Sequence, residues 1–242
     1  MTGDDGLRGA ADGRTLHRLH YYLVHDGAGG PEGLLVEEFL LAVDHSCVGL
    51  VSAGWHRAQG RWSDASATSR RVRVEPTLWA RVTPAGRAGA ATLYRSLCGA
   101  DLPGETTLRA CFGVPCVPPS PPLLLHRPEA TPGFRETRVY RILFVGALPP
   151  GGLAALGEEW RMPVTGDLGE PGVRVLGTVR RRVGRDAFRW ELRRVAAGAA
   201  WGLDVTCDLA GGRDEAVGVL LRDLTTQVRQ QGLIPVTVDR FR

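Results

Sequence analysis

Residues 173–209 read VRVLGTVRRRVGRDAFRWELRRVAAGAAWGLDVTCDL, and apolar residues occupy every second position through most of this stretch. Its middle segment alternates apolar with charged side chains, which are Phe188, Arg189, Trp190, Glu191, Leu192 and Arg193. A period of two is typical of β-strands that have one buried face, here called the dry face, and one solvent-exposed face, here called the wet face. Residues 184–186 (GRD) form a short turn between two such strands. The stretch therefore predicts a three-stranded antiparallel meander.

The residues on both sides of this meander add two helices and two strands. Residues 137–145 (TRVYRILFV) predict a buried strand, and Leu153, Leu156 and Trp160 have the spacing of a short helix. A second helix follows Asp214, and Gly232 stands at its C-terminal end. Its apolar stripe consists of Val217, Leu220, Leu221, Leu224 and Val228. Residues 234–238 predict the last strand. The C-terminal half is thus predicted to be α+β, with an antiparallel sheet and helices on one face, as a ferredoxin-like variant.

The N-terminal half predicts a second, β-rich α+β subdomain. Residues 16–24 and 47–55 are expected strands, whereas residues 34–43 fit a helix or a strand; we favour the strand. Residues 57–71 are small and polar, which indicates a long loop, and residues 72–74 predict a short strand. Thr83–Pro84 predicts the start of a helix that ends at Gly99, with a shorter helix over 105–112.

Proline defines the expected boundary between the two halves. Seven of the sixteen prolines fall within residues 114–134, a composition typical of an extended linker. The expected organisation has four parts: a disordered lead-in at 1–14, an N-terminal subdomain at 15–113, the linker at 114–134 and a C-terminal subdomain at 135–242.

Composition excludes several classes of protein. The 242 residues contain no lysine and no asparagine, so no P-loop, lysine Schiff base or lysine general base is possible. Both missing residues have AT-rich codons, which indicates a GC-rich bacterial genome. No apolar run approaches the roughly 20 residues of a membrane span. The first residues do not resemble a secretory signal, and the five cysteines are scattered, so we expect a cytoplasmic protein with no membrane partner.

The meander also carries the densest positive charge of the chain. Residues 173–194 contain eight arginines and two acids, a net charge of +6 against +4 for the whole chain. Arginine offers a planar fork of donors suited to phosphate, and basic sheet faces can hold nucleic-acid backbones. The candidate nucleic-acid-binding residues are Arg174, Arg180, Arg182, Arg185, Arg189 and Arg193. Strand alternation predicts that all but Arg185, at the turn, share the wet face.

The same pattern also fits arginines that have a purely structural role in the sheet. Asp204 and Asp208 are expected on the wet face of the adjoining strand, where they could pair with Arg189 and Arg193. The aromatic residues of the meander are expected to point inward, so stacking platforms for bases are missing. Cys207 on the dry face and Cys98 near a helix end are expected to be core thiols.

Candidates for catalysis or metal binding are dispersed. His17, His20, His25 and Asp26 lie close in sequence, but a strand would separate them onto two faces. Ser46 beside His45, Ser63–Asp64, Cys111 and Cys116 lack the setting of an activated nucleophile. Glu37 and Glu38 are neighbours on a strand, so one is expected to be buried or paired and the other solvated. We predict no metal site, no cofactor and no catalytic residue set.

These patterns leave three functions to distinguish. The first is a non-catalytic binding, adaptor or regulatory protein that acts through a protein partner, which should show an exposed apolar patch. The second is a nucleic-acid-binding module that uses the arginine-rich hairpin, with affinity that falls steeply with salt. The third is an enzyme with a pocket lined by some of His17, His25, His45, His56, Asp64 or Glu37. The sequence leaves the oligomeric state open.

Overall fold

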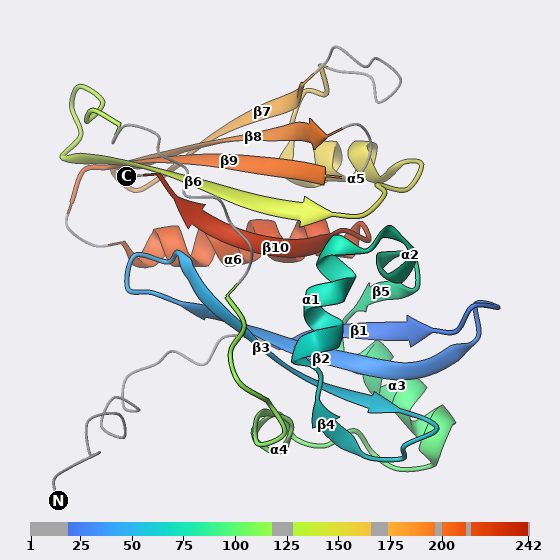
Figure 1. Ribbon diagram of the computed structural model, residues 1–242. Helices are drawn as coiled ribbons and strands as arrows, with labels where there is room; N and C mark the ends of the chain where they lie inside the picture. The colour runs from blue at the N-terminus through green and yellow to red at the C-terminus, as the bar shows by residue number, and fades with distance from the viewer. Residues whose placement is uncertain (1–18, 118–127, 166–173, 197–199, 212–213, 242) are drawn as a thin grey trace, which may run out of the picture.

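The computed structural model describes residues 19–117, 128–165, 174–196, 200–211 and 214–241, which form two antiparallel five-stranded sheets and six helices (Figure 1). The predicted lead-in at 1–14 and residues 118–127 of the predicted linker lie outside the described residues. In the described part, no helix combines the length and apolar character needed to cross a membrane. The chain is therefore mixed α+β, as the sequence predicts.

The C-terminal half follows the predicted order of elements. They are β6 (Glu136–Val145), α5 (Gly152–Trp160), β7 (Val175–Val183), β8 (Asp186–Ala196), β9 (Ala200–Leu209), α6 (Glu215–Gln230) and β10 (Ile234–Arg240). The sheet has the order β10-β6-β9-β8-β7, so the meander β7–β9 is confirmed and β7 forms one edge. Gly232, just beyond α6, adopts φ +88°, a left-handed conformation that suits the predicted helix end.

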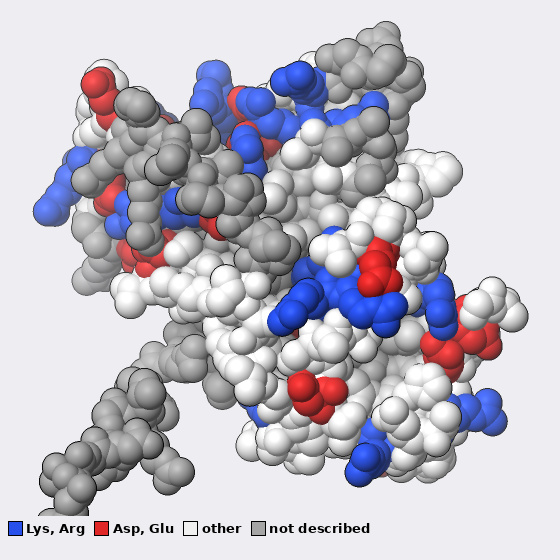
Figure 2. All heavy atoms as spheres, in the orientation of Figure 1, with Lys and Arg blue, Asp and Glu red and all other residues white. Residues whose placement is uncertain are grey.

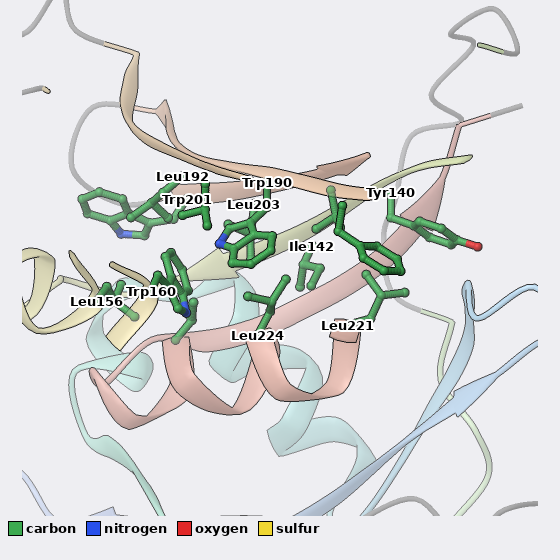
Figure 3. Close-up of a cluster of buried hydrophobic side chains, with 14 of the residues drawn as sticks. Tyr140, Ile142, Leu156, Trp160, Trp190, Leu192, Trp201, Leu203, Leu221 and Leu224 are labelled. Atoms are coloured by element: carbon green, nitrogen blue, oxygen red, sulfur yellow. The ribbon is translucent and has the colours of Figure 1, made fainter. Parts of the chain in front are cut away.

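Both helices of this half cover the same face of the sheet. Figure 3 shows Leu156 and Trp160 of α5 and Leu221 and Leu224 of α6 pointing toward the apolar side chains of the sheet. The rings of Trp160 and Trp190 meet edge to face, with centroids 6.3 Å apart. The alternation read from the sequence thus separates a buried face from the face that carries the arginines.

The N-terminal half contains a second sheet and four helices within the described residues. Its elements are β1 (His20–His25), β2 (Pro31–Leu41), β3 (Cys47–His56), β4 (Trp62–Asp64), α1 (Ser66–Val74), α2 (Pro76–Trp79), β5 (Val82–Ala85), α3 (Arg87–Cys98) and α4 (Glu105–Arg109). The strand order is β4-β3-β2-β1-β5. The ambiguous segment 34–43 is a strand as favoured. It carries apolar residues on both of its faces because both faces are covered: Val36 packs in the cluster with Tyr94 of α3, and Leu35 packs with Val72 of α1.

The long loop predicted for residues 57–71 is wrong, and so is the short strand at 72–74. The chain forms β4 and then α1, which turns Ser69 and Val72 into the core. The Asp64 carboxylate accepts hydrogen bonds from the backbone N and Oγ of Ser66, at 2.9 and 2.6 Å, and fixes the first turn. Only two or three inward positions define this helix, so its apolar period is too weak to recognise among small polar residues.

The predicted helix start at Thr83–Pro84 is also wrong. Both residues lie in β5, which pairs with β1 at the edge of its sheet, and α3 begins at Arg87. Proline is tolerated on an edge strand because its missing N–H need not face a neighbour. The end of the helix is as predicted, with Gly99 at φ +74°.

The two halves pack against one another through α6 and β10. Figure 1 shows α6 lying between the two sheets. Ile234 of β10 is buried in one cluster with Tyr22 and Leu35 of the N-terminal sheet. The guanidinium of Arg229 donates a hydrogen bond of 3.0 Å to the carbonyl of Tyr21, and the Tyr140 hydroxyl donates one of 2.9 Å to the carbonyl of Asp44.

Candidate functional site

The arginine-rich surface belongs to the β7–β8 hairpin. Its turn is tight because Gly184 adopts φ +60°, which lets Val183 pair directly with Asp186. The register then places Arg180 opposite Arg189, on the face away from the apolar core. Figure 2 shows basic side chains over the part of the molecule that holds this sheet.

Near the middle of the sheet, the arginines of the outer face are paired with acids. Arg193 contacts Glu191 at 2.6 Å and Asp204 at 3.0 Å, and Asp204 also pairs with Arg141 at 2.6 Å. The predicted pairing of Arg193 with a β9 aspartate is therefore confirmed. Asp208 is engaged differently, because its carboxylate accepts hydrogen bonds from the hydroxyls of Thr131 and Thr137 at 2.7 and 2.6 Å.

Toward the turn, the arginines have no such partners. Four of them are exposed and have no ion pair within the described residues: Arg180, Arg182, Arg185 and Arg189. The acid nearest to them in sequence, Asp186, accepts a hydrogen bond of 2.8 Å from the backbone N of Ala210. We call this set the distal arginines. Within the described residues, neither Asp186 nor Glu191 of β8 forms an ion pair with them.

Two further arginines of the hairpin lie elsewhere. The guanidinium of Arg181 lies 5.3 Å from the ring centroid of Trp190, which places it on the side of the sheet that carries the core. Arg174 precedes β7, and a β-bulge between Val175 and Gly177 interrupts the alternation beyond it. The register pairs Val175 with Arg193, so the expected alignment of Arg174 with the other arginines is wrong.

A hollow runs beside the edge strand β7. It has a volume of about 870 Å³ and is lined by several arginines, among them Arg161 just after α5, Arg180 of β7 and Arg189 of β8. Glu159 and Glu191 also line it, so the hollow is not uniformly positive. The distal arginines therefore present their donors partly on the open sheet face and partly along its edge.

The histidines do not gather into one site. His17 lies outside the described residues, and His20 packs against Phe39, with ring centroids 5.6 Å apart. His25 Nδ1 lies 3.3 Å from the carbonyl of Gly29, and His56 Nε2 lies 3.5 Å from Glu32. In the described ranges, no three His, Cys, Asp or Glu side chains come together in a way that could hold a metal ion.

The other predicted polar candidates have local structural roles. Asp64 holds Ser66 at the start of α1, and these hydrogen bonds lower the pKa of the Asp64 carboxyl. The Ser46 hydroxyl bonds Asp44 at 2.6 Å. Cys111 is half-buried and Cys116 is buried. Cys207 is buried as predicted, whereas Cys98 is exposed, because its end of α3 is not covered.

The expectation for Glu37 and Glu38 is wrong, since both are buried and both are paired. Their strand is covered on both faces, so residues that point in opposite directions each meet an arginine. Glu38 accepts from Arg109 of α4 at 2.8 Å, and Glu37 accepts from Arg73 of α1 at 2.7 and 2.8 Å. The pair formed by Glu37 and Arg73 is 0% and 2% exposed.

This buried pair joins the two halves of the chain. Ser69 donates a hydrogen bond to Glu37, and Arg73 Nε donates one of 3.0 Å to the carbonyl of Pro235 in β10. Burial lowers the pKa of the Arg73 guanidinium, but the charge of Glu37 and its hydrogen bonds to Arg73 together outweigh burial and raise the pKa above its ordinary value. Burial and then the Glu37 charge raise the pKa of Tyr22 to about 12. Sequence reasoning missed this network because Arg73 lies in the segment assigned to loop and strand.

Comparisons of the chain with family models, with curated proteins and with solved structures found no match. The candidate site is therefore defined by its own geometry, which is the contrast between the paired arginines in the middle of the sheet and the distal arginines near the hairpin turn.

Proposed function

We propose that the chain is a non-catalytic binding protein that contacts an acidic surface of a protein partner through the distal arginines. The observation that carries this proposal is the contrast along one sheet face. Arg193 and Arg141 are neutralised by acids at 2.6–3.0 Å, whereas Arg180, Arg182, Arg185 and Arg189 have no ion pair within the described residues. An arginine fork forms two parallel hydrogen bonds with a carboxylate, so this set suits an acidic ligand.

A protein partner is favoured over a nucleic acid by the placement of the aromatic rings. Phe188 and Trp190 are 3% and 1% exposed, and Arg181 lies over Trp190 from the core side. Bases would therefore find no ring to stack on at the outer face of this hairpin, and stacking contributes much of the affinity for single strands. Carboxylates on a protein surface need only the guanidinium donors.

Nucleic-acid binding is the second candidate, and the same arginines favour it. Their forks match phosphate oxygens as well as carboxylates, and an open sheet face can follow a backbone without reading its bases. A binder of this kind would recognise charge alone.

Binding to two polyanions separates the candidates. Poly-L-glutamate and mixed-sequence single- and double-stranded nucleic acids are titrated by fluorescence anisotropy across roughly 50 to 200 mM salt, a range over which several phosphate contacts cost orders of magnitude in affinity. The protein-binding proposal expects affinity for poly-L-glutamate that falls at least tenfold in the triple variant R180Q/R182Q/R189Q. Tighter, salt-steep binding of nucleic acid, lost in the same variant, would replace it by the second candidate.

The matched control removes the same charge elsewhere. Arg57, Arg61 and Arg70 are exposed in the N-terminal half, and their triple glutamine variant should bind as the wild type does. Equal loss in both triple variants would contradict the proposal, because binding would then follow net charge rather than the hairpin.

We also propose a cytoplasmic setting and a chain of two subdomains joined by the proline-rich segment. The strand order β10-β6-β9-β8-β7 supports an interpretation of the C-terminal half as a ferredoxin-like variant with β7 as an added edge strand.

A further inference from the structure

A separate cleft lies where the two halves meet. It has a volume of about 350 Å³, within the range of small-molecule sites, and runs along α6 between the end of β2 and β10. Figure 1 shows the β2–β3 turn next to the first part of α6. No residue of the arginine-rich hairpin lines this cleft, so it is independent of the proposed binding surface.

The wall of the cleft is largely apolar. The apolar side chains of the wall come from both halves and include Phe39, Leu41, Leu221, Pro235 and Val238. Space for the cleft depends on Gly218 of α6, against which the ring of His45 packs. A methyl group at Gly218 would lie 2.7 Å from Cε1 of His45, closer than any real contact. The interior therefore suits the apolar body of a ligand.

One cation of the cleft is left without a counter-ion. Arg222 is partly buried and forms no ion pair within the described residues. Asp214, at the other end, is already engaged by Arg138 at 2.8 Å and faces His45 at 3.7 Å. Glu215 is seven positions from Arg222, roughly 10 Å along the helix axis, so a bound anion would lie at the Arg222 end.

Arg222 is left as the donor for a bound anion because the neighbouring hydroxyl groups are engaged, which favours a ligand with one negative charge. Thr225 and Thr226 donate to the carbonyls of Leu221 and Arg222 at 2.7 and 2.8 Å, so their protons are not available to a ligand. A phosphate carries more charge than one guanidinium balances, whereas a carboxylate matches one fork.

We propose that this cleft binds a small amphipathic monocarboxylate. The carboxylate accepts hydrogen bonds from Arg222, and the apolar chain lies against Phe39, Leu41 and Val238. Binding joins α6 to the end of β2, so the ligand contacts both halves of the molecule.

The probe for this proposal is decanoate, used below its micelle concentration, with its uncharged amide as the comparison. Calorimetric titration of the full chain should show one decanoate per chain. R222Q should weaken decanoate binding roughly ten- to a hundredfold, the effect of losing hydrogen bonds to a charged group. R222Q should leave the affinity for the amide unchanged, and R57Q, an exposed arginine outside the cleft, should leave both affinities unchanged.

A second variant and a resonance of the cleft test whether decanoate binds inside the cleft. L41W fills the cleft and should abolish decanoate binding while the thermal unfolding transition is retained. Decanoate should also shift the backbone amide resonance of Gly218 in a nuclear magnetic resonance spectrum. Three results would overturn the proposal: no binding of decanoate, decanoate affinity unaffected by R222Q and L41W, or a wild-type dimer that L41W dissociates, which would make the cleft an interface between copies.

Discussion

At the scale of single residues, the most consequential feature is the buried pair of Glu37 and Arg73. Each charge loses its water on folding, and the loss is offset by two mutual hydrogen bonds together with those from Ser69 and to Pro235. The energetic value of such a pair is asymmetric. Removing one partner strands a charge in the interior, whereas replacing both with apolar residues of similar volume is often neutral or stabilising.

Glu37→Gln should therefore lower the free energy of unfolding by about 3–5 kcal/mol, because Arg73 is left buried without its counter-ion. Urea unfolding followed by tryptophan fluorescence measures this loss. The double variant E37L/R73M should recover most of it. E75Q, which removes the exposed partner of Arg71, is the control and should change stability little. A double variant as unstable as E37Q would show that packing around the pair, rather than its charge, is the cause.

The buried thiol of Cys207 makes stability depend on pH. Burial raises its pKa to about 12, while an unfolded thiol titrates near 8.5. Below about pH 8.5 both states are protonated and stability is complete. As pH rises from there toward 12, only the unfolded state releases the proton, so the free energy of unfolding falls by up to about 1.4 kcal/mol per pH unit.

The slope of unfolding free energy against pH between 9 and 11 tests this origin. C207A should have a shallower slope than the wild type, by nearly one proton, even if its stability is lower at every pH. C98A, which removes an exposed thiol, should retain the wild-type slope. Equal slopes in C207A and the wild type would show that the decline comes from other groups, such as Cys47 and Tyr22, whose pKa values burial also raises.

At the scale of elements, the period of the apolar residues correctly predicts those strands and helices that bury only one face. The meander β7–β9 and α6 each have one buried face, and their sequences alternate accordingly. The period fails where contacts between distant segments determine the secondary structure. Segment α1 is a helix because Ser69 and Val72 pack against β2 and its neighbours. Thr83 and Pro84 lie in a strand because they pair with β1. The bulge at Val175–Gly177 leaves no mark in the alternation, so the misplacement of Arg174 could not be foreseen.

The end of α3 offers a test of a single backbone conformation. Gly99 has φ +74°, and an added methyl group would meet no atom within 4 Å. Gly99→Ala should therefore lower stability by about 1 kcal/mol through left-handed strain alone. Gly104 also has open space, but its φ is −59°, so Gly104→Ala should be neutral or slightly stabilising. Thermal unfolding of the two variants measures the difference, and equal effects would contradict the assigned conformation of Gly99.

At the scale of the whole molecule, the two halves share buried structure that the sequence does not reveal. The sequence alone identified the hairpin as a basic surface, because its arginines are dense and alternate with apolar residues, which places most of them on one face. Arg193 is neutralised by Asp204 of β9, which also pairs with Arg141 of β6. The cleft is lined by residues that range along the chain from His20 to Val238. Contacts between distant segments follow from packing, and neither composition nor period encodes them.

Substitution of Ile234 tests whether the two halves unfold together. It is 1% exposed and packs with Tyr22, Leu35 and Val72 of the N-terminal half. Ile234→Ala should cost about 2–5 kcal/mol. Hydrogen exchange of amides in β2 and in β9 should report equal losses of protection. A loss confined to β9 would show instead that the halves unfold independently.

The position of β7 at the edge of its sheet has a consequence for the behaviour of the protein in solution. An edge strand offers unpaired backbone groups to any other strand, and charged side chains are a common protection against such pairing. Arg180, Arg181 and Arg182 stand together on this edge, where two copies of the chain would repel each other. An acidic ligand that neutralises them removes the repulsion. Saturation with such a ligand should therefore raise light scattering at a fixed protein concentration, and aggregation would accompany the very contact that the hairpin is suited to make.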